Sequence, residues 1–434
     1  MKNKLLTLSL LLTLSFTLTG CSLSDLPVIG KFFGEKVVPA KEVTLTMWGL
    51  WENPAVMATM IEKYRETNPN VTINYEDRSV IESGAYKDRV FARIGQSSVP
   101  DLVATHASWV PRLVKDLSAA PSTLISTQDY QQKFYPSATD NAVFQGKVYA
   151  VPLYYDGLIL VYNRKHFEEV GQLSPPTGWK EFRDLAVNLT VRGDGGSIVR
   201  AGAAMGTADN NDFFSDILGL VFSQAGISIP NDLDTKNAKD ALEFYTNFAT
   251  EDRVWNDSFL EASTAFAKEK VSMIFVPTWS ILDIIYSRKD MDIGVAPVPQ
   301  ALPDSPVSWS SYWMYVVPSA SENSAVAWDF LNFLVQEEQQ LMLFNEASKY
   351  RQYGAPYSLV SLASQVSTNP YLSPALDTAG YGKMYEITGR SGNNRRVDIL
   401  RNAVNAILVG KRKNEPVEIS EVLRTVKQEL IRAQ

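Results

Sequence analysis

The sequence has few of the side chains on which metal sites and covalent catalysis usually depend. It contains one cysteine, Cys21, and two histidines, His106 and His166, in 434 residues. A single cysteine excludes an internal disulfide framework, and with only two histidines we expect no metal site. No Gly-x-Ser-x-Gly elbow, Walker-type loop or dinucleotide fingerprint is present. We therefore expect a protein without catalysis, metal or cofactor, and we place His166 at the surface.

Long apolar runs are also scarce. Leu5–Leu18, a run of about 14 residues behind a basic start, fits the core of a signal peptide and is too short to span a membrane. It ends in Leu18-Thr19-Gly20-Cys21, which resembles the bacterial lipobox, whose cysteine is lipidated. We expect residues 1–20 to be a lipoprotein signal peptide and residues 21–40 to be lipidated Cys21 and a tether. The mature chain is then anchored by lipid at the extracytoplasmic face of a bacterial cell membrane.

Basic residues are not in excess either. The chain has 41 Lys and Arg against 48 Asp and Glu, which gives a formal net charge of −7. This balance argues against nucleic acid as a partner. Apolar residues make up 45% of the chain, enough for sizeable cores, and the length suggests two or three domains. We expect a monomer.

Strand-like and helix-like segments alternate along the first part of the chain. A strand over residues 42–48 precedes a helix with Asn53 as N-cap and Pro54 at its first position. Two more strands are predicted over Val71–Tyr75 and Leu102–Thr105. This alternation indicates an α/β domain with a largely parallel sheet. In such sheets, ligands bind at loops beyond the carboxyl ends of the strands.

The later part of the chain continues in the same way. Strands are predicted over Val199–Met205, Val271–Val276 and Asp292–Ala296, and one helix is predicted over Ala325–Phe344. A last helix carries Ile419, Val422, Leu423, Val426 and Leu430 as one apolar stripe, which indicates ordinary core packing.

Val148–Asn163 holds two apolar strand-like runs separated by Tyr154-Tyr155-Asp156-Gly157. We interpret this segment as the chain crossing from one sheet to another, with a polar and aromatic patch at the crossing. Pro306–Pro318 has the same character, and Ser348–Ser361 is a candidate third crossing. The chain is therefore predicted to form two lobes with a cleft between them.

Aromatic residues gather at the predicted strand ends and crossings. Flat rings stack on the C–H faces of sugar rings, and neighbouring carboxylates and amides pair with sugar hydroxyls. Glu52 and Asp156 are expected in the cleft as hydroxyl acceptors, although a carboxylate pair for glycoside hydrolysis stays open. The aromatic set is Trp48, Trp51, Trp109, Tyr154, Tyr155, Trp279, Trp309, Tyr312 and Trp313.

A series of segments, in this order and spacing, resembles family 1 of the bacterial extracellular solute-binding proteins. This group contains the maltose-binding protein and feeds carbohydrate ABC transporters. The segments cover nearly the whole mature chain. They are the lipobox, Val43–Trp48 with its Trp-Glu loop, Pro100–Leu102, Gly146–Pro152, Leu160–Asn163, Pro175–Trp179 with Phe182, Phe266–Met273, Pro277–Trp279 and Ala327–Leu331.

The resemblance implies a two-lobed periplasmic-binding-protein (Venus-flytrap) fold of class α/β, in which each lobe is a mostly parallel sheet flanked by helices. The N-terminal lobe would comprise residues 41–153 plus 313–350, and the C-terminal lobe residues 158–308 plus 360–434. Hinges would lie near 153–158, 308–313 and 350–360. The implied ligand contacts are Trp48, Glu52, Ser108, Trp109, Tyr155, Asp156, Asn211, Trp279, Trp309, Tyr312 and Arg351.

The implied function is that of a receptor that captures a carbohydrate and delivers it to an ABC transporter permease. The family pattern often has Gly where this chain has Thr278 and Tyr312, which leaves the width of the cleft open. Three alternatives also stay open. They are a secreted glycosidase-like hydrolase, a receptor for a non-sugar solute, and a surface lipoprotein that no longer serves transport.

Overall fold

The first of two five-stranded sheets begins close to the start of the described chain. The computed structural model describes residues 41–433, so the expected signal peptide, Cys21 and its tether lie outside the described residues. The strand order is β2-β1-β3-β13-β6; β2, β1 and β3 are parallel, and β13 is antiparallel to β3 and β6. The bounds are β1 (Val43–Gly49), β2 (Val71–Asp77), β3 (Leu102–His106), β6 (Ala150–Pro152) and β13 (Trp313–Val316).

Helices pack on this sheet to form the first lobe. Helix α1 begins as predicted, with the Asn53 side chain accepting the Ala55 N–H and Pro54 at its first position. It packs against β2, α12 and α13, and α2 packs against β3. The bounds are α1 (Pro54–Arg65), α2 (Ser83–Arg93), α3 (Val110–Leu113), α4 (Thr127–Lys133), α5 (Pro136–Ala142), α12 (Ser324–Leu334) and α13 (Glu337–Ala347).

The second sheet has the order β11-β7-β10-β9-β8, and only β9 and β10 are parallel. The prediction of a mostly parallel sheet in each lobe is therefore wrong for this sheet. Strands that enter from the other lobe run against their neighbours, as β7 does against β10 and β13 does against β3. The bounds are β7 (Leu158–Asn163), β8 (Val191–Arg192), β9 (Ile198–Ala203), β10 (Val271–Pro277) and β11 (Ile293–Ala296).

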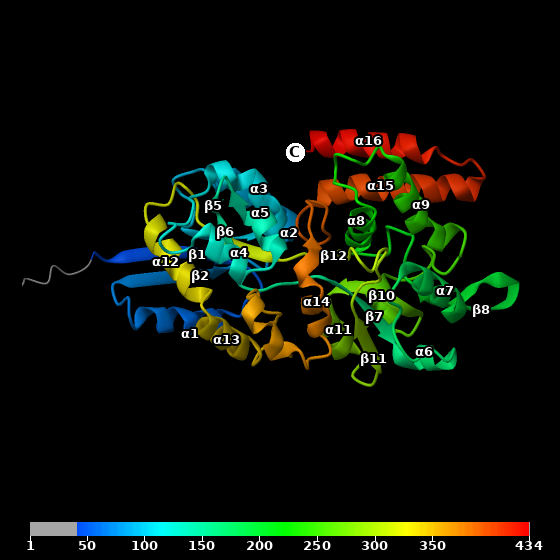
Figure 1. Cartoon of the computed structure of the whole chain (residues 1–434), viewed down its shortest axis with the longest axis horizontal. Coiled ribbons are helices and arrows are strands. Elements are labelled where there is room, and N and C mark those ends of the chain that lie inside the picture. The colour runs from blue at the N-terminus through cyan, green and yellow to red at the C-terminus, as the bar shows by residue number, and fades with distance from the viewer. Residues whose placement is uncertain (1–40, 434) are drawn as a thin grey trace, which may run out of the picture. The chain divides into compact units, whose positions relative to one another are not determined.

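The second lobe is this sheet with its helices. At the end of the chain, α15 and α16 pack against each other and against α9 (Figure 1). The predicted stripe of α16 is buried at Ile419, Leu423, Val426 and Leu430. The helices are α6 (Arg164–Glu169), α7 (Trp179–Leu189), α8 (Phe214–Gln224), α9 (Lys236–Thr250), α10 (Ala262–Ala267), α11 (Ser280–Ser287), α14 (Ser373–Asp377), α15 (Asn394–Lys413) and α16 (Ile419–Arg432).

Several short elements complete the described chain. Two pairs of two-residue strands form separate ladders, β4 with β5 and β12 with β14. None of the helices in residues 41–433 combines the length and the apolar character of a membrane span. The short elements are β4 (Val143–Phe144), β5 (Lys147–Val148), β12 (Ser308–Trp309), β14 (Gly382–Lys383), and the 3₁₀ turns η2 (Ala107–Trp109), η3 (Val114–Asp116), η4 (Asp194–Gly196), η5 (Val360–Val366) and η6 (Ala379–Tyr381).

Two predictions about local structure are wrong. The single helix over residues 325–344 is two helices, α12 and α13, because Gln336 takes an extended backbone with ψ 153°. Its side-chain amide donates to the Asn332 carbonyl oxygen at 2.7 Å, which satisfies one free carbonyl at the end of α12. His166, expected at the surface, is buried, because α6 starts directly at the end of β7 and turns the ring toward Ser272 on β10.

The three predicted crossings lie side by side. The Tyr155 N–H donates to the Pro356 carbonyl oxygen and the Ser311 N–H donates to the Asp156 carbonyl oxygen, both at 3.0 Å. Isolated bridges join Tyr154 to Tyr357 and Gly157 to Ser310. The chain therefore passes between the two sheets through segments that are hydrogen-bonded to one another.

Candidate functional site

A cavity of about 730 Å³ lies where the crossings meet the loops of both sheets. The first lobe contributes the loops after β1 and β2, and the second lobe contributes the turn between β10 and α11 and the loop before α15. Seven predicted contact residues line it: Glu52, Tyr155, Asp156, Trp279, Trp309, Tyr312 and Arg351.

The predicted contacts Trp48 and Trp109 lie outside the lining, inside the first lobe. Trp48 is buried among core residues and Trp109 is fully buried. The Trp109 ring packs edge-on against Trp313, with centroids 5.0 Å apart. Both tryptophans are therefore core residues, and Trp109 supports Trp313, which lines the cavity.

Ser108 and Asn211 are also absent from the lining, because their side chains bond to nearby protein atoms. The Ser108 hydroxyl lies 2.8 Å from His106 Nδ1. The Asn211 amide donates to the Ala204 carbonyl oxygen at 3.0 Å and accepts the Phe213 N–H at 3.0 Å. Both side chains hold their own loops, and the prediction that they contact a ligand stays a prediction.

Two tryptophans present exposed rings to the cavity, one from each lobe. Trp51, in the loop after β1, is 48% exposed, and its ring packs edge-on against Trp313 at 4.8 Å. Trp279, in the turn before α11, is 39% exposed and packs edge-on against Phe213 at 5.8 Å. Each ring is fixed by an aromatic neighbour while its remaining surface is free for a ligand.

The Trp51 backbone adopts a conformation that few non-glycine residues take. Its φ is +56°, in the left-handed region. Its N–H donates to the Ser79 hydroxyl, and Ser79 is itself bonded to Asp77 at the end of β2. Backbone strain of this kind persists where surrounding contacts hold it, as it does in binding sites. The β2–α2 loop thus positions Trp51.

Glu52 is a buried carboxylate with an incomplete set of partners. It accepts the Tyr154 hydroxyl and the Asn53 N–H, the latter at 3.0 Å. Arg351 approaches it, with Nη2 at 3.8 Å from Oε2. Burial raises the pKa of Tyr154 well above its ordinary value, so the phenol stays a donor. Glu52 and Arg351 together provide an acceptor and a set of donors on the same wall.

The Asp156 carboxylate has hydrogen-bond partners within the protein that the sequence did not predict. Its Oδ1 accepts the Gly157 N–H at 2.7 Å and the Thr278 N–H at 2.9 Å. Burial raises its pKa to about 6, although these N–H groups oppose the shift. Asp156 therefore ties the first crossing to the turn that carries Trp279, in addition to lining the cavity.

Asp216 is a lining residue that sequence reasoning missed. Its Oδ1 accepts the Trp309 indole N–H at 2.7 Å, and its Oδ2 accepts the Gly389 N–H at 2.7 Å. Burial raises its pKa to about 7. In the sequence, Asp216 could have been noticed as the single carboxylate in the mostly apolar first turns of α8 (Phe214–Gln224).

The other missed residues come from strand β3, from helices α2 and α11, from the crossings and from loops of both lobes. His106, also in the lining, has its pKa lowered to about 3 by burial, so it is a neutral ring. Arg390 lines the cavity and forms an ion pair with Asp212. No group of His, Cys, Asp or Glu suited to a metal ion occurs in residues 41–433. The remaining missed polar and aromatic residues are Ser79, Glu82, Ser83, Phe213, Asp283, Tyr286, Ser311, Tyr350 and Ser391.

Comparison with known proteins gives three representative relatives. The maltotriose-binding protein of Pyrococcus abyssi is 19% identical over 76% of this chain and 68% of its own. An ABC transporter solute-binding protein from Thermotoga lettingae, solved with alpha-D-tagatose, has a TM-score of 0.66 and 19% identity, over 90% of this chain and 98% of that one. The cyclic alpha-maltosyl-1,6-maltose binding protein of Arthrobacter globiformis has a TM-score of 0.68 and 17% identity, over 89% and 97%.

The structural likenesses show that the two-lobed fold is shared. Residues 50–341, about two thirds of the chain, match the family described as bacterial extracellular solute-binding protein. The chain belongs to the bacterial extracellular solute-binding protein family.

Proposed function

We propose that this protein is the substrate-binding receptor of an ABC importer and that it captures a sugar or oligosaccharide in the cavity. The observation that carries the proposal is the pair Trp51 and Trp279, whose exposed rings come from different lobes and line one cavity. Relatives whose names specify maltotriose, tagatose and cyclic maltosyl-maltose support a carbohydrate over other solutes.

The proposed recognition divides between rings and polar groups. Trp51 and Trp279 stack on the apolar faces of sugar rings, which buries large area at a low cost in side-chain entropy. Glu52 accepts hydroxyl protons, and Arg351 donates to hydroxyl or ring oxygens. An unpaired hydroxyl in this cavity is costly, so these polar groups select among sugars. The volume of about 730 Å³ lies within the usual range of about 300–1,000 Å³ for small-molecule sites.

Closure is proposed to couple binding to transport. We assign residues 41–153 plus 313–350 to one lobe and residues 158–308 plus 360–434 to the other. A ligand that contacts both lobes stabilises the closed form, which the membrane permease then recognises. Because the proposed role requires only ligand binding, we propose that the protein has no catalytic activity. We also propose that it is a monomer.

The proposal includes a lipid anchor at Cys21, outside the described residues. It rests on the Leu18–Cys21 motif behind the apolar run Leu5–Leu18. The protein then stays at the extracytoplasmic face of the membrane, beside its permease. Labelled palmitate should be incorporated into the protein in bacterial cells, and Cys21→Ser should abolish the incorporation. Equal labelling of both forms contradicts the anchor.

A thermal-shift screen tests the proposed ligand class directly. The purified protein is melted with monosaccharides and with malto- and manno-oligosaccharides, and calorimetry follows for any sugar that raises Tm. We expect at least one sugar to raise the Tm of the wild type and to raise the Tm of Trp279→Ala by less. No shift with any sugar contradicts the proposal, and release of shortened sugars from the bound ligand contradicts the absence of catalysis.

A further inference from the structure

The segment 386–396 comprises the end of the loop after β14 and the first residues of α15. It belongs to the second lobe by its connection to α15 but contacts the first lobe extensively. The Trp109 indole N–H donates to the Ser391 carbonyl oxygen at 3.1 Å. Gly392, with φ +74°, passes so close to α2 that a Cβ there would lie 2.6 Å from the Ser83 carbonyl oxygen. This segment is therefore fitted closely against the first lobe.

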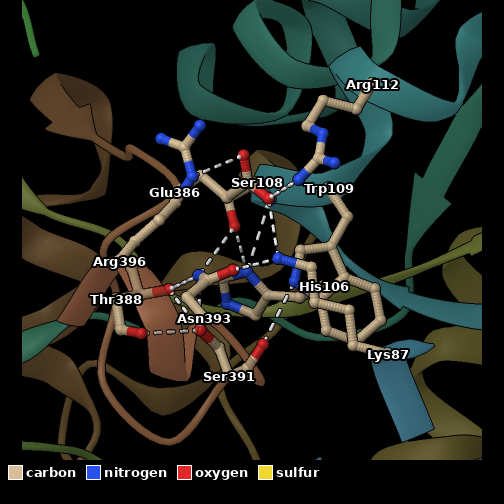
Figure 2. Close-up of polar contacts among 10 residues, drawn as sticks. All are labelled: Lys87, His106, Ser108, Trp109, Arg112, Glu386, Thr388, Ser391, Asn393 and Arg396. Atoms are coloured by element: carbon tan, nitrogen blue, oxygen red, sulfur yellow. Dashed lines mark hydrogen bonds and ion pairs between the residues drawn. The ribbon is translucent and has the colours of Figure 1, made fainter. Parts of the chain in front are cut away.

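Glu386 is the centre of the polar contacts between this segment and the first lobe (Figure 2). Its side chain is 9% exposed, and one oxygen lies 2.6 Å from Lys87 Nζ and 2.7 Å from Arg112 Nη1. Its other oxygen lies 3.3 Å from Arg396 Nε. Lys87 is on α2 and Arg112 on α3, both in the first lobe, whereas Arg396 is on α15 in the second. One carboxylate thus binds three cations across the boundary between the lobes.

Lys87 depends on the second lobe for its oxygen partners. Besides Glu386, its ammonium donates to Asn393 Oδ1 at 2.7 Å. Within its own lobe it lies over the rings of Phe91 and Trp109, 5.5 Å from each centroid. Movement of segment 386–396 away from α2 would therefore remove both oxygens from Lys87 and leave only the aromatic rings.

The same segment forms part of the cavity wall. Gly389, Arg390 and Ser391 line the cavity, and the Gly389 N–H is bonded to Asp216. Only two residues lie between Glu386, which makes the ionic contacts, and Gly389, where this part of the cavity wall begins. The ionic contacts with α2 and α3 therefore fix the position of residues that face the cavity.

We propose that Glu386 is a positioning residue that, with Lys87 and Arg112, forms an ionic latch between the lobes and sets how slowly the cavity releases its ligand. The effect on ligand release rests on the proposed function, whereas the latch itself can be tested without a ligand.

The latch depends on an excess of positive charge in a cluster of side chains that is largely buried. Burying charges is costly, and the attraction within the cluster offsets that cost only while the carboxylate is present. In Glu386→Gln, Lys87, Arg112 and Arg396 remain together without their common partner and repel one another. Separation of the lobes relieves the repulsion, because it moves Lys87 and Arg112 away from Arg396. Lys87→Met should have a smaller effect, since it leaves Glu386 with two cations.

A distance measurement between the lobes tests the latch without ligand. In the full chain carrying Cys21→Ser, spin labels are placed at Lys133→Cys on α4 and Arg424→Cys on α16, both exposed positions. We expect Glu386→Gln to shift the distance distribution toward a more open population, and Lys87→Met/Glu386→Gln to reverse part of that shift.

Asp252→Asn is the matched control. Asp252 accepts two hydrogen bonds from Arg183, at 2.7 and 2.8 Å, and both residues belong to the second lobe. Its side chain is 12% exposed, comparable to that of Glu386. This variant should leave the distance distribution unchanged. An unchanged distribution in Glu386→Gln, or an equal shift in Asp252→Asn, overturns the latch.

Binding kinetics test the effect on ligand release, with maltotriose as the probe. Glu386→Gln should raise koff about tenfold or more and leave kon within about threefold, because the latch acts after the lobes close. An unchanged koff overturns this part of the proposal. If neither maltotriose nor any other sugar of the thermal-shift screen binds the wild type, the proposed function fails, and the spin-label distances still decide whether the latch exists.

Discussion

The indole N–H of Trp309 donates to the Asp216 carboxylate at 2.7 Å, which joins the second crossing to helix α8. The ring lies directly over Gly219, one turn further along the helix, where a Cβ would lie well inside van der Waals contact with the ring. The other Asp216 oxygen accepts the Gly389 N–H. Crossing, helix and cavity loop are thus held by one buried carboxylate and one glycine.

Gly219→Ala should therefore destabilise the protein. The added methyl group collides with the Trp309 ring, and overpacking of this kind costs about 1–3 kcal/mol. Gly380→Ala is the control, because no atom would lie within 4 Å of its added Cβ. Urea unfolding of both variants checks the difference. Equal stability of the two variants would show that Trp309 moves aside freely.

Stability should depend on pH through Asp216. Its pKa is raised from 3.8 to about 7 in the folded state, so the folded protein binds a proton more tightly than the unfolded chain. Below about pH 4 both states are protonated, and between about pH 4 and 7 only the unfolded state loses its proton. Folding stability therefore falls over that range, by up to about 4 kcal/mol from this group.

Asp216→Asn isolates this contribution, because all other carboxyl groups stay in place. The stability of the wild type minus that of the variant should decrease steadily from pH 4 to pH 7, as measured by urea unfolding at each pH. A constant difference would mean that Asp216 is ionised throughout, held so by the Trp309 and Gly389 N–H groups.

Trp279→Ala should weaken sugar binding while leaving the fold intact. The ring is 39% exposed, so its loss removes little core packing, while a stacking ring in a binding site contributes about 1–2 kcal/mol or more. The dissociation constant should rise roughly fivefold to thirtyfold by calorimetry, and Trp279→Phe should keep most of the affinity. An unchanged constant in Trp279→Ala would remove this ring from the site.

The outcome for the tryptophans illustrates how far the sequence could lead. Strand β1, the helix start at Asn53 and the aromatic character of the crossings can be predicted from the local sequence pattern. Trp48 and Trp51 stand in the same short stretch, yet the first points into the core and the second lines the cavity. That difference depends on the left-handed backbone at Trp51 and its bond to Ser79, which no local pattern specifies.

Partners that are distant in sequence explain what else was missed. Asp216 meets Trp309 across 93 positions, and Lys87 meets Glu386 across 299. Each residue is unremarkable within its own segment. Only the packing of the crossings and of segment 386–396 brings these partners together, so their roles require the tertiary structure.

The structure changes the expected result for Asp156→Ala. As a ligand contact alone, its loss would weaken binding and spare the fold. Because Oδ1 accepts the N–H groups of Gly157 and Thr278, its removal leaves two donors near the hinge without their acceptor. We expect a loss of about 1–3 kcal/mol in unfolding free energy together with weaker sugar binding.

Asp156→Asn separates the two effects. Its carbonyl oxygen still accepts both N–H groups, so stability should not fall below that of the wild type, while the negative charge that attracts a sugar hydroxyl is lost. Urea unfolding and calorimetry on the same preparations give both quantities. If Asp156→Asn binds sugar as tightly as the wild type while Asp156→Ala is destabilised, the residue holds the hinge and does not contact the ligand.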